Sequence, residues 1–203
     1  MFKFIKGILT IILLLCVVFA GVFIIDKHYL RNDVLRLHVV ANSDSAEDQM
    51  VKLHVKDALL AYFESSMADI TDAQSAKAFL KENLSELEEV ANRALISLGV
   101  TDVAKVSLTQ EAFDIRQYDT FALPAGIYEA LRVEIGEAAG KNWWCVAFPS
   151  LCAGATTEEF KATAISSGMG AGLSNALAGD KGYEIRFLLL DWFGKIENLI
   201  SKK

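Results

Sequence analysis

Residues 35–63 read LRLHVVANSDSAEDQMVKLHVKDALLAYF, and this stretch predicts a strand, a polar turn and a helix in succession. The mostly apolar run Leu35–Ala41 is typical of a buried strand. The turn Asn42–Ser45 follows, and side chains of these types bond to nearby backbone in turns and helix caps. Ser45 stands three residues before Asp48, which approximates a capping box at the start of a helix. Three polar residues precede the capping residue, more than a cap requires, so the turn is also a candidate contact surface.

An apolar segment precedes this stretch. Lys3 and Lys6 open the chain, and Ile8–Ile25 is apolar with few interruptions. As a helix this segment would span roughly 27 Å, close to the ~30 Å hydrocarbon thickness of a bilayer. Lysines placed before the segment orient the N-terminus to the cytoplasm and the rest of the chain outside. We therefore predict a signal peptide or membrane anchor over residues 1–27 and one extracytoplasmic domain over residues 28–203.

The sequence leaves open whether the N-terminal segment is removed. Val18-Phe19-Ala20 suits a signal peptidase, and Ile8–Phe19 has the length of a signal core. Apolar character continues through Ile25, however, and an uncleaved anchor explains that better. In either case the part of the chain from about Arg31 onward is expected outside the cytoplasm.

The charge and length exclude some classes of function. The chain has 203 residues and a formal net charge of −6, with the acidic side chains spread out. This balance argues against binding nucleic acid and against tight docking on anionic lipid. The part outside the membrane is long enough for one domain with a full core and short for two.

Cysteine usage indicates a possible disulfide. Cys145 and Cys152 are the only two cysteines outside the apolar segment, in a compartment where disulfides persist. Bridged Cα atoms lie within about 7 Å, whereas seven steps of straight strand span about 23 Å. The chain would have to fold back near Pro149-Ser150. Two free buried cysteines are the alternative, and two cysteines alone supply too few ligands for zinc.

Two helices are predicted in the first half of the domain. The first covers Ala46–Phe63 and has its apolar residues on one face. The second begins after the capping residue Asp72 and ends at Gly99. Its apolar positions recur at spacings of three and four, at Ala76, Leu80, Leu84, Leu87, Ala91, Ala94 and Leu98.

Strands are predicted in the second half. Val106 and Leu108 alternate with polar residues, and so do the apolar residues of 131–135, as in half-buried strands. The aromatic run Trp143–Phe148 follows a turn and predicts a hairpin with 131–135. Residues 183–187 predict a last strand.

The end of the chain completes the predicted fold. Residues 166–182 are rich in glycine and alanine and predict a loop, while 190–200 predict a closing helix. Gly168–Gly172 is not a phosphate-binding loop, because no lysine follows at the required position. Helices early and strands late predict an α+β domain, with a mainly antiparallel sheet and helices packed on one face.

The histidines offer one candidate catalytic pair. Those at 28 and 54 are predicted to be a solvated residue and a helix-surface residue. His38 falls within the predicted strand, shortly before Asp44, and a histidine near a carboxylate is the minimum for a general base. A nucleophile would have to be a serine of the turn 42–45, and none stands in a Gly-x-Ser-x-Gly elbow. A structural role for His38 is favoured, and a membrane-tethered envelope hydrolase using His38 and Asp44 is the alternative.

Two long motifs bear a resemblance to a known family. Their residues are, in order, Arg36–Ser45 with Asp48-Gln49 and Lys52, and then Gly140–Pro149 with Leu151-Cys152. On these motifs, their spacing and the preceding apolar segment, the chain resembles the stage II sporulation protein R family from Leu35 to Cys152.

The resemblance implies a signalling role in endospore-forming bacteria. Proteins of this family are made in the forespore and exported into the space facing the mother cell. There they switch on a membrane-embedded aspartic protease, which matures the precursor of the mother-cell sigma factor. The resemblance implies no enzymatic activity and no catalytic residue. A structural septal protein without a switching role is a further hypothesis.

The expected partners follow from this implication. They are the protease and, if the N-terminal segment stays uncleaved, the membrane, with no cofactor, metal, nucleic acid or small-molecule substrate. Tryptophan is enriched at binding hot spots, but neighbours on a strand point to opposite faces. One of the two adjacent tryptophans is therefore expected to be buried. The candidate contact residues are Arg36, His38, Asn42, Ser43, Asp44, Ser45, Asp48, Gln49, Trp143 and Trp144.

Overall fold

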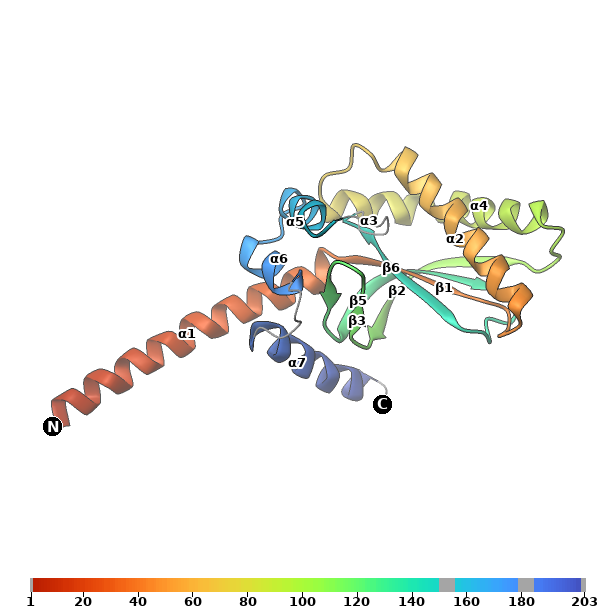
Figure 1. Ribbon diagram of the computed structural model, residues 1–203. Helices are drawn as coiled ribbons and strands as arrows, with labels where there is room; N and C mark the ends of the chain where they lie inside the picture. Colours follow the sequence, from red (N-terminus) through yellow and green to blue (C-terminus); the bar gives the residue numbers. More distant parts are fainter. Residues whose placement is uncertain (1, 150–155, 179–184, 202–203) are drawn as a thin grey trace.

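A four-stranded sheet with the order β2–β5–β1–β6 organises the computed structural model, which describes residues 2–149, 156–178 and 185–201. The described residues form seven helices and six strands, arranged as Figure 1 shows. The long helix α1 (Phe2–Asn32) projects from one end of the sheet and leads directly into β1. The position of β1 explains the rest of the arrangement.

β1 (Leu35–Val40) occupies the interior of the sheet. It pairs in parallel with β5 (Gly126–Ile135) and antiparallel with β6 (Asn142–Phe148), while β2 (Ala104–Phe113) pairs antiparallel with β5. Two of these three pairings are antiparallel, which confirms the predicted α+β fold with a mixed, mainly antiparallel sheet. The predicted hairpin of β5 with β6 is wrong, because β1 lies between them. All six residues of β1 are buried, and an interior position covers both faces and both edges of such a strand.

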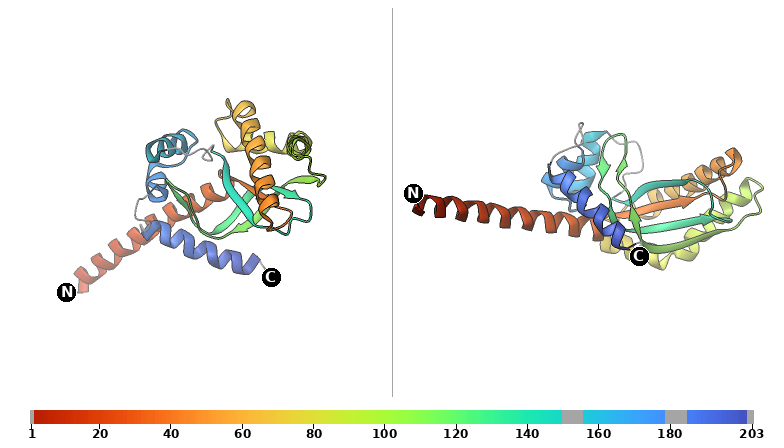
Figure 2. Two further views of the ribbon diagram at one scale, coloured as in Figure 1. Left: turned by 45° about the vertical axis from the view of Figure 1, so that its right-hand side comes forward. Right: turned by 90° about the horizontal axis from the view of Figure 1, so that it is seen from below.

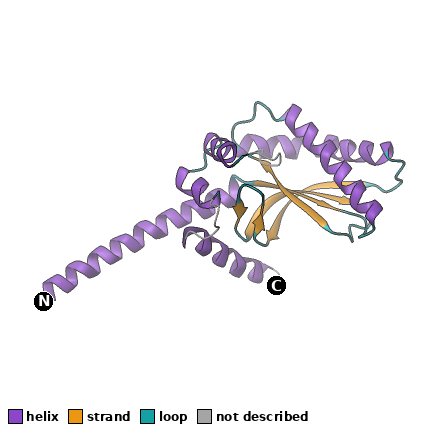
Figure 3. Ribbon diagram, in the orientation of Figure 1, coloured by secondary structure: helices purple, strands orange, loops and turns teal. Residues whose placement is uncertain are grey.

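The first core lies between one face of the sheet and three helices. Leu35, Leu37 and Val39 point from alternate positions of β1 into this core, together with Leu131 and Val133 of β5. The helices cover the face that is uppermost in Figures 1 and 3. They are α2 (Ala46–Ser66), α3 (Ala73–Glu82) and α4 (Leu84–Ser97). These three helices match the prediction that helices pack on one face of the sheet.

The predicted second helix is divided at Asn83. Its beginning is confirmed, because the Asp72 carboxylate accepts a hydrogen bond from the Ser75 amide, and so is its end, where Gly99 has a φ of +72°. Between them, Asn83 is not helical, and its side-chain amide donates to the Phe79 carbonyl. Asparagine side chains compete in this way with the backbone bonds of a helix, which periodicity of apolar residues does not reveal.

A second core lies on the opposite face of the sheet. It joins Phe113 and Tyr128 of the sheet to Phe160, Phe187 and other apolar side chains of the C-terminal half. The elements around it are β3 (Arg116–Gln117), β4 (Ala122–Leu123), α5 (Thr157–Ser166), α6 (Ala171–Leu177) and α7 (Ile185–Ser201). Helices therefore also cover part of this face, and Figure 3 shows α7 below the strands.

Two expectations for the C-terminal region are corrected. The stretch 166–182 contains the helix α6, whose residues Leu173 and Leu177 are buried in the second core. The predicted strand 183–187 is wrong for 185–187, which begin α7, whereas 183 and 184 lie outside the described residues. A short alternating run was mistaken for a strand, because the buried residues of this segment recur with helical spacing. The helix predicted over 190–200 is confirmed as the end of α7.

The apolar helix α1 is long enough to cross a membrane. Its segment Lys3–Asn32 has a mean hydropathy of 3.3 in its most apolar window, and none of that window is buried. This fits a signal or anchor segment by length and composition. The last turns of α1 belong to the folded domain, since Leu30 is buried in the second core. A cut after Ala20 would leave these turns in place.

Candidate functional site

The β1–α2 turn is tied to the loop between β5 and β6. Asn42 is central to this connection, because its side-chain oxygen accepts a hydrogen bond from the Glu137 amide at 2.9 Å. Its side-chain amide donates to Asp48, whose carboxylate also accepts from the Ser43 hydroxyl. The hydrogen bond from Ser43 is the largest cause of a lowered pKa for Asp48. The Asp48 amide in turn donates to the Ser45 hydroxyl, which confirms the predicted cap.

The connection continues through charged side chains. The Asp44 carboxylate accepts a hydrogen bond from the Lys141 amide at 2.6 Å. The Lys52 ammonium is buried and donates to the Lys141 carbonyl and to Gln49, whose amide reaches the Ser43 carbonyl. Burial lowers the pKa of Lys52. We call this set the turn network, and its members are Asn42, Ser43, Asp44, Asp48, Gln49, Lys52 and the loop 136–141.

Two glycines make the turn network possible. A Cβ on Gly140 would lie 2.1 Å from the Ser43 carbonyl oxygen, and one on Gly136 would lie 2.4 Å from the Asn42 side-chain oxygen. Such distances are far below van der Waals contact. The turn has more polar residues than a helix cap requires, and the structure explains them. Their side chains hold the turn and the loop 136–141 in close contact. Of the predicted contact residues in the turn, Asp44 and Ser45 are exposed and the others are half-buried.

Arg36 lies in the core rather than on a contact surface. Its side chain is fully buried, with the guanidinium 4.3 Å from the ring centroid of Phe113 and 5.2 Å from that of Tyr128. Nε donates to the Cys145 carbonyl and Nη2 to the Tyr118 hydroxyl. Burial lowers the pKa of Arg36, although aromatic faces and hydrogen bonds stabilise its cation. Sequence alone placed it in a motif without showing which way it points.

His38 pairs with Glu111 and not with Asp44. Its Nδ1 lies 2.6 Å from the Glu111 carboxylate, which Arg132 also approaches, while Asp44 is bound in the turn network. Burial acts to raise the pKa of Glu111, but the hydrogen bond and charge of His38, with Thr109 and Arg132, leave that pKa lowered. The opposite ring nitrogen of His38 is buried and without a hydrogen-bond partner among the described residues.

An open cleft of about 350 Å³ lies beside this pair. The Trp144 ring stacks on His38 at a centroid distance of 5.7 Å, and the Arg116 guanidinium lies 3.5 Å from the centroid of Trp144. We call this region the His38 cleft, and its principal side chains are His38, Glu111, Arg116, Arg132 and Trp144. It combines a half-buried aromatic face with two arginines and the carboxylates of Glu111 and Asp114. Arg132 is paired with Glu111 and Glu134, so Arg116 with the Trp144 ring is the part that suits a partner presenting a carboxylate or a planar group.

The adjacent tryptophans point to opposite faces, as expected for a strand. Trp144 belongs to the His38 cleft, whereas Trp143 packs against the first core and lies 5.3 Å from the Lys56 ammonium. Both are half-buried, so neither is the fully buried partner that was expected. Trp144 remains the better candidate contact, because it borders an open cleft.

Only one of the two cysteines in the predicted disulfide, Cys145, lies within the described residues. Cys145 is buried in β6 and is disulfide-bonded, whereas Cys16 is free. Cys152 lies outside the described residues, so the pairing of these two cysteines stays a prediction. The other histidines lie as expected on exposed positions, His28 beside Asn32 and His54 beside Ser97.

Sequence reasoning missed three members of the His38 cleft. Glu111 lies on β2 opposite Tyr128, Arg132 lies on β5 opposite His38, and Arg116 follows in β3. Their only sequence signal is a charged residue within a strand, and of the three Arg132 alone has apolar neighbours on both sides. Without the strand order β2–β5–β1–β6, nothing indicated that they meet His38.

The chemistry available in the cleft is limited. His38, held by Glu111, could act as a general base, but no serine of the turn lines this cleft to serve as a nucleophile. Within residues 2–149, 156–178 and 185–201, no group of three or more histidine, cysteine or acidic side chains could hold a metal ion. Fold and sites thus define a class of protein: an α+β domain on an apolar helix, with a rigid polar turn and a cleft that combines aromatic rings with charges of both signs.

The chain belongs to the stage II sporulation protein R family, whose family model matches residues 31–158. It is also similar to Stage II sporulation protein R of Bacillus subtilis (strain 168), with 34% identity over 121 residues. That match covers 60% of this chain and 54% of the relative, so the chain spans about half the length of the relative. No solved structure matches the chain. The matched residues include both the turn network and the His38 cleft.

Proposed function

We propose that this chain is an exported sporulation signal that activates a membrane-embedded aspartic protease. Activation would lead to maturation of the mother-cell sigma-factor precursor from the space between forespore and mother cell. Family membership and the apolar helix α1 support this proposal. The observation that favours binding over catalysis is the turn network, in which the polar residues of the first motif bond within the chain.

The His38 cleft is the proposed contact with the protease. Arg116 and Trp144 are partly exposed there, and Trp144 lies on β6 two residues after the start of that strand. The cleft therefore adjoins the rigid loop 136–141, which would hold its aromatic face in position. Asp44 and Ser45, the exposed residues of the turn, add a polar rim.

Co-expression of the full chain with the protease and the sigma-factor precursor tests this function. We expect cleavage of the precursor to depend on the chain, and cleavage that is unaffected by its presence would overturn the proposal. In the same assay Arg116→Gln should reduce cleavage by roughly tenfold or more, as loss of a binding hot spot does. Arg93→Gln is the matched control, because Arg93 is exposed on α4, away from the cleft.

A membrane-tethered envelope hydrolase is the second candidate. The 2.6 Å contact between His38 and Glu111 favours it, because it supplies a general-base pair. His38→Gln separates the two functions when folding is monitored by circular dichroism. A hydrolase would lose nearly all activity, whereas an activator would keep most precursor cleavage, since glutamine can still bond to Glu111. Measurement of envelope degradation by the full chain gives the direct readout.

A further inference from the structure

The C-terminal helix α7 has an apolar face that points away from the domain. Its inward face is buried at Phe187, Leu190, Asp191, Gly194 and Asn198. The apolar side chains on its outward face are between 36 and 71% exposed, and they are Leu188, Trp192, Phe193, Ile196, Leu199 and Ile200. Six large apolar side chains on one exposed helix face form a surface of the kind that contacts protein or membrane.

The inward face is docked tightly, so the outward face has a fixed direction. A Cβ on Gly194 would lie 1.6 Å from the Ala125 carbonyl oxygen, which shows how closely the backbone of α7 approaches the sheet. The Asp191 carboxylate accepts a hydrogen bond from the Ala125 amide, and the Asn198 side chain donates to the Phe113 carbonyl. Rotation of α7 that buried its apolar face would break these buried contacts.

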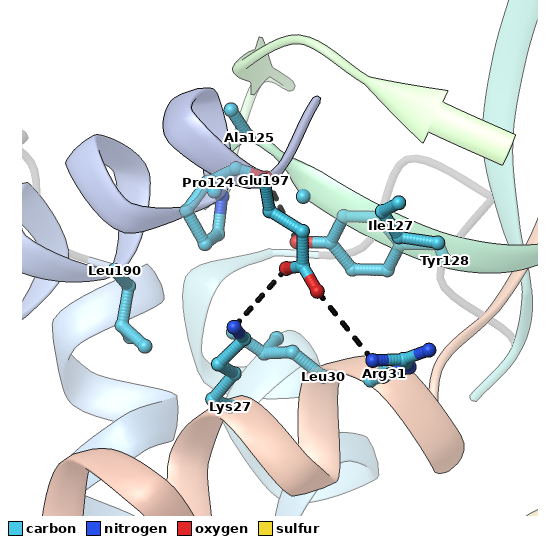
Figure 4. Close-up of a pocket in the computed structure, with 11 residues that line it drawn as sticks. Lys27, Leu30, Arg31, Pro124, Ala125, Ile127, Tyr128, Leu190 and Glu197 are labelled. Carbon is cyan, nitrogen blue, oxygen red and sulfur yellow. Dashed lines mark hydrogen bonds and ion pairs between the residues drawn. The ribbon is translucent and has the colours of Figure 1, made fainter. Parts of the chain in front are cut away.

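The outward face adjoins the apolar helix α1. The rings of Phe23 and Phe193 lie 4.9 Å apart, and Glu197 forms ion pairs with Lys27 and Arg31 of α1, as Figure 4 shows. An apolar groove of about 840 Å³ is lined by Leu189 and Phe193 of α7 and by side chains of residues 12–23 of α1. Both views in Figure 2 show α7 beside the domain end of α1, running obliquely to it.

The position of α7 along α1 indicates where the bilayer surface would lie. The apolar run of α1 ends at Ile25, and Asp26 and Lys27 are the first charged residues beyond it. Phe193 therefore lies level with the last apolar turn of α1, and Glu197 lies level with the first charged turn. An anchored α1 would hold the part of α7 around Phe193 at the boundary between hydrocarbon and headgroups.

We propose that α7 is an interfacial helix whose outward face lies in the same bilayer surface that α1 enters. Amphipathic helices bury an apolar face in this way to a depth of about 5–10 Å, and tryptophan favours that level. The occupant is zwitterionic phospholipid. The chain has a net charge of −6 and α7 contributes no row of cations, so apolar burial rather than anionic lipid would drive the contact. The domain would then have one fixed orientation over the membrane. This inference does not depend on the proposed function.

The depth of the Trp192 side chain in a bilayer tests the proposal directly. The full chain is labelled with 5-fluorotryptophan and placed in phosphatidylcholine nanodiscs, and the ¹⁹F resonance of Trp192 is assigned by its absence in Trp192→Phe. We expect lipid with a spin label near the headgroup to broaden this resonance beyond detection, and a water-soluble gadolinium chelate to leave it sharp. Trp143 is the internal control, because it pairs with Val39 at the end of β1 away from α1. Its resonance should survive the labelled lipid.

Two results would overturn the proposal. A Trp192 resonance that survives the labelled lipid and broadens with the chelate would place the helix face in water. A resonance shielded from both agents would show that protein covers the face, either a second copy or another partner. The double variant Leu188→Ser, Leu199→Ser should expose Trp192 to the chelate. Ile96→Ser, an equally apolar exposed site on α4, should leave the Trp192 resonance unchanged, and the folded state of each variant is checked by its other two tryptophan resonances.

Discussion

The turn network follows the end of β1 and the His38 cleft lies alongside β1, but the two are built by different rules. In the turn network, short polar side chains bond to backbone groups of a neighbouring loop, and glycines allow the loops to touch. In the His38 cleft, long charged side chains meet aromatic rings around open space. The first arrangement is costly to disturb because the loops touch at the two glycines and several hydrogen bonds to carboxylates and backbone are lost together. In the second, the partly exposed side chains Arg116 and Trp144 can change at little cost, and they are therefore the better place for recognition.

The largest loss of stability is expected for Gly140→Ala. The added Cβ would meet the Ser43 carbonyl oxygen at 2.1 Å, so one of the two loops must move and the bonds between them must break. We expect the free energy of unfolding to fall on the order of 3 kcal/mol, measured by chemical denaturation of the full chain in detergent. Gly170→Ala is the matched control, because nothing lies within 4 Å of its added Cβ. Equal effects of both variants would show that the turn network is not rigid.

A smaller loss is expected for Asn42→Ala. This change leaves the Glu137 amide without its acceptor at 2.9 Å and removes one donor to Asp48. The expected cost is about 2 kcal/mol, from lost hydrogen bonds and desolvated groups. Asn175→Ala, at an exposed position of α6, should change stability far less in the same denaturation experiment. A negligible cost at Asn42 would mean that the contacts of the turn are readily replaced by water.

The pH dependence of stability distinguishes the cleft from its surroundings. The pKa of Glu111 is lowered in the folded protein, so its stabilisation is complete above its ordinary pKa of 4.5 and is lost as the pH falls through the folded value. The melting temperatures of the wild type and Glu111→Gln should therefore differ at neutral pH and converge in acid. Glu134→Gln, a more exposed partner of Arg132, is the control. Curves that stay parallel below pH 4.5 would contradict the assignment.

The smallest effect on stability is expected for Arg116→Gln. A cation over a partly exposed aromatic ring contributes about 0.5–1 kcal/mol, and the loss of this contact with Trp144 should cost no more. Thermal melting of the variant should therefore lie close to that of the wild type, while precursor cleavage falls. A large drop in melting temperature would show that the cleft is part of the core and would remove the contrast with the turn network.

Much of the fold could be predicted from local patterns. The strand and capped helix in 35–63, the apolar helix α1 and the strand positions β2, β5 and β6 all follow from periodicity and capping residues. The strand order around β5 and β6 could not be predicted from such patterns. Their closeness in the sequence favours a hairpin, whereas burial of β1 places that strand between them. The start of α7 was missed for a related reason, since three alternating residues fit either a strand or a helix.

The candidate site was predicted only in part. Sequence indicated that the turn 42–45 and the two tryptophans matter, and the structure explains the turn through bonds to a loop nearly a hundred residues away. In the structure, His38 also pairs with Glu111, and Arg36 is buried among aromatic rings. Neither contact could be predicted from the sequence.

The sequence by itself determined the class of protein, the long apolar segment at the start of the chain, the α+β composition and the family. These properties depend on local hydrophobicity and on motifs that are contiguous in the chain. Only the tertiary structure decided which side chains meet, which face of α7 is left exposed and which polar residues are already occupied. Such contacts arise from strand order and helix docking, which are set by burial summed over the whole domain rather than by any one segment.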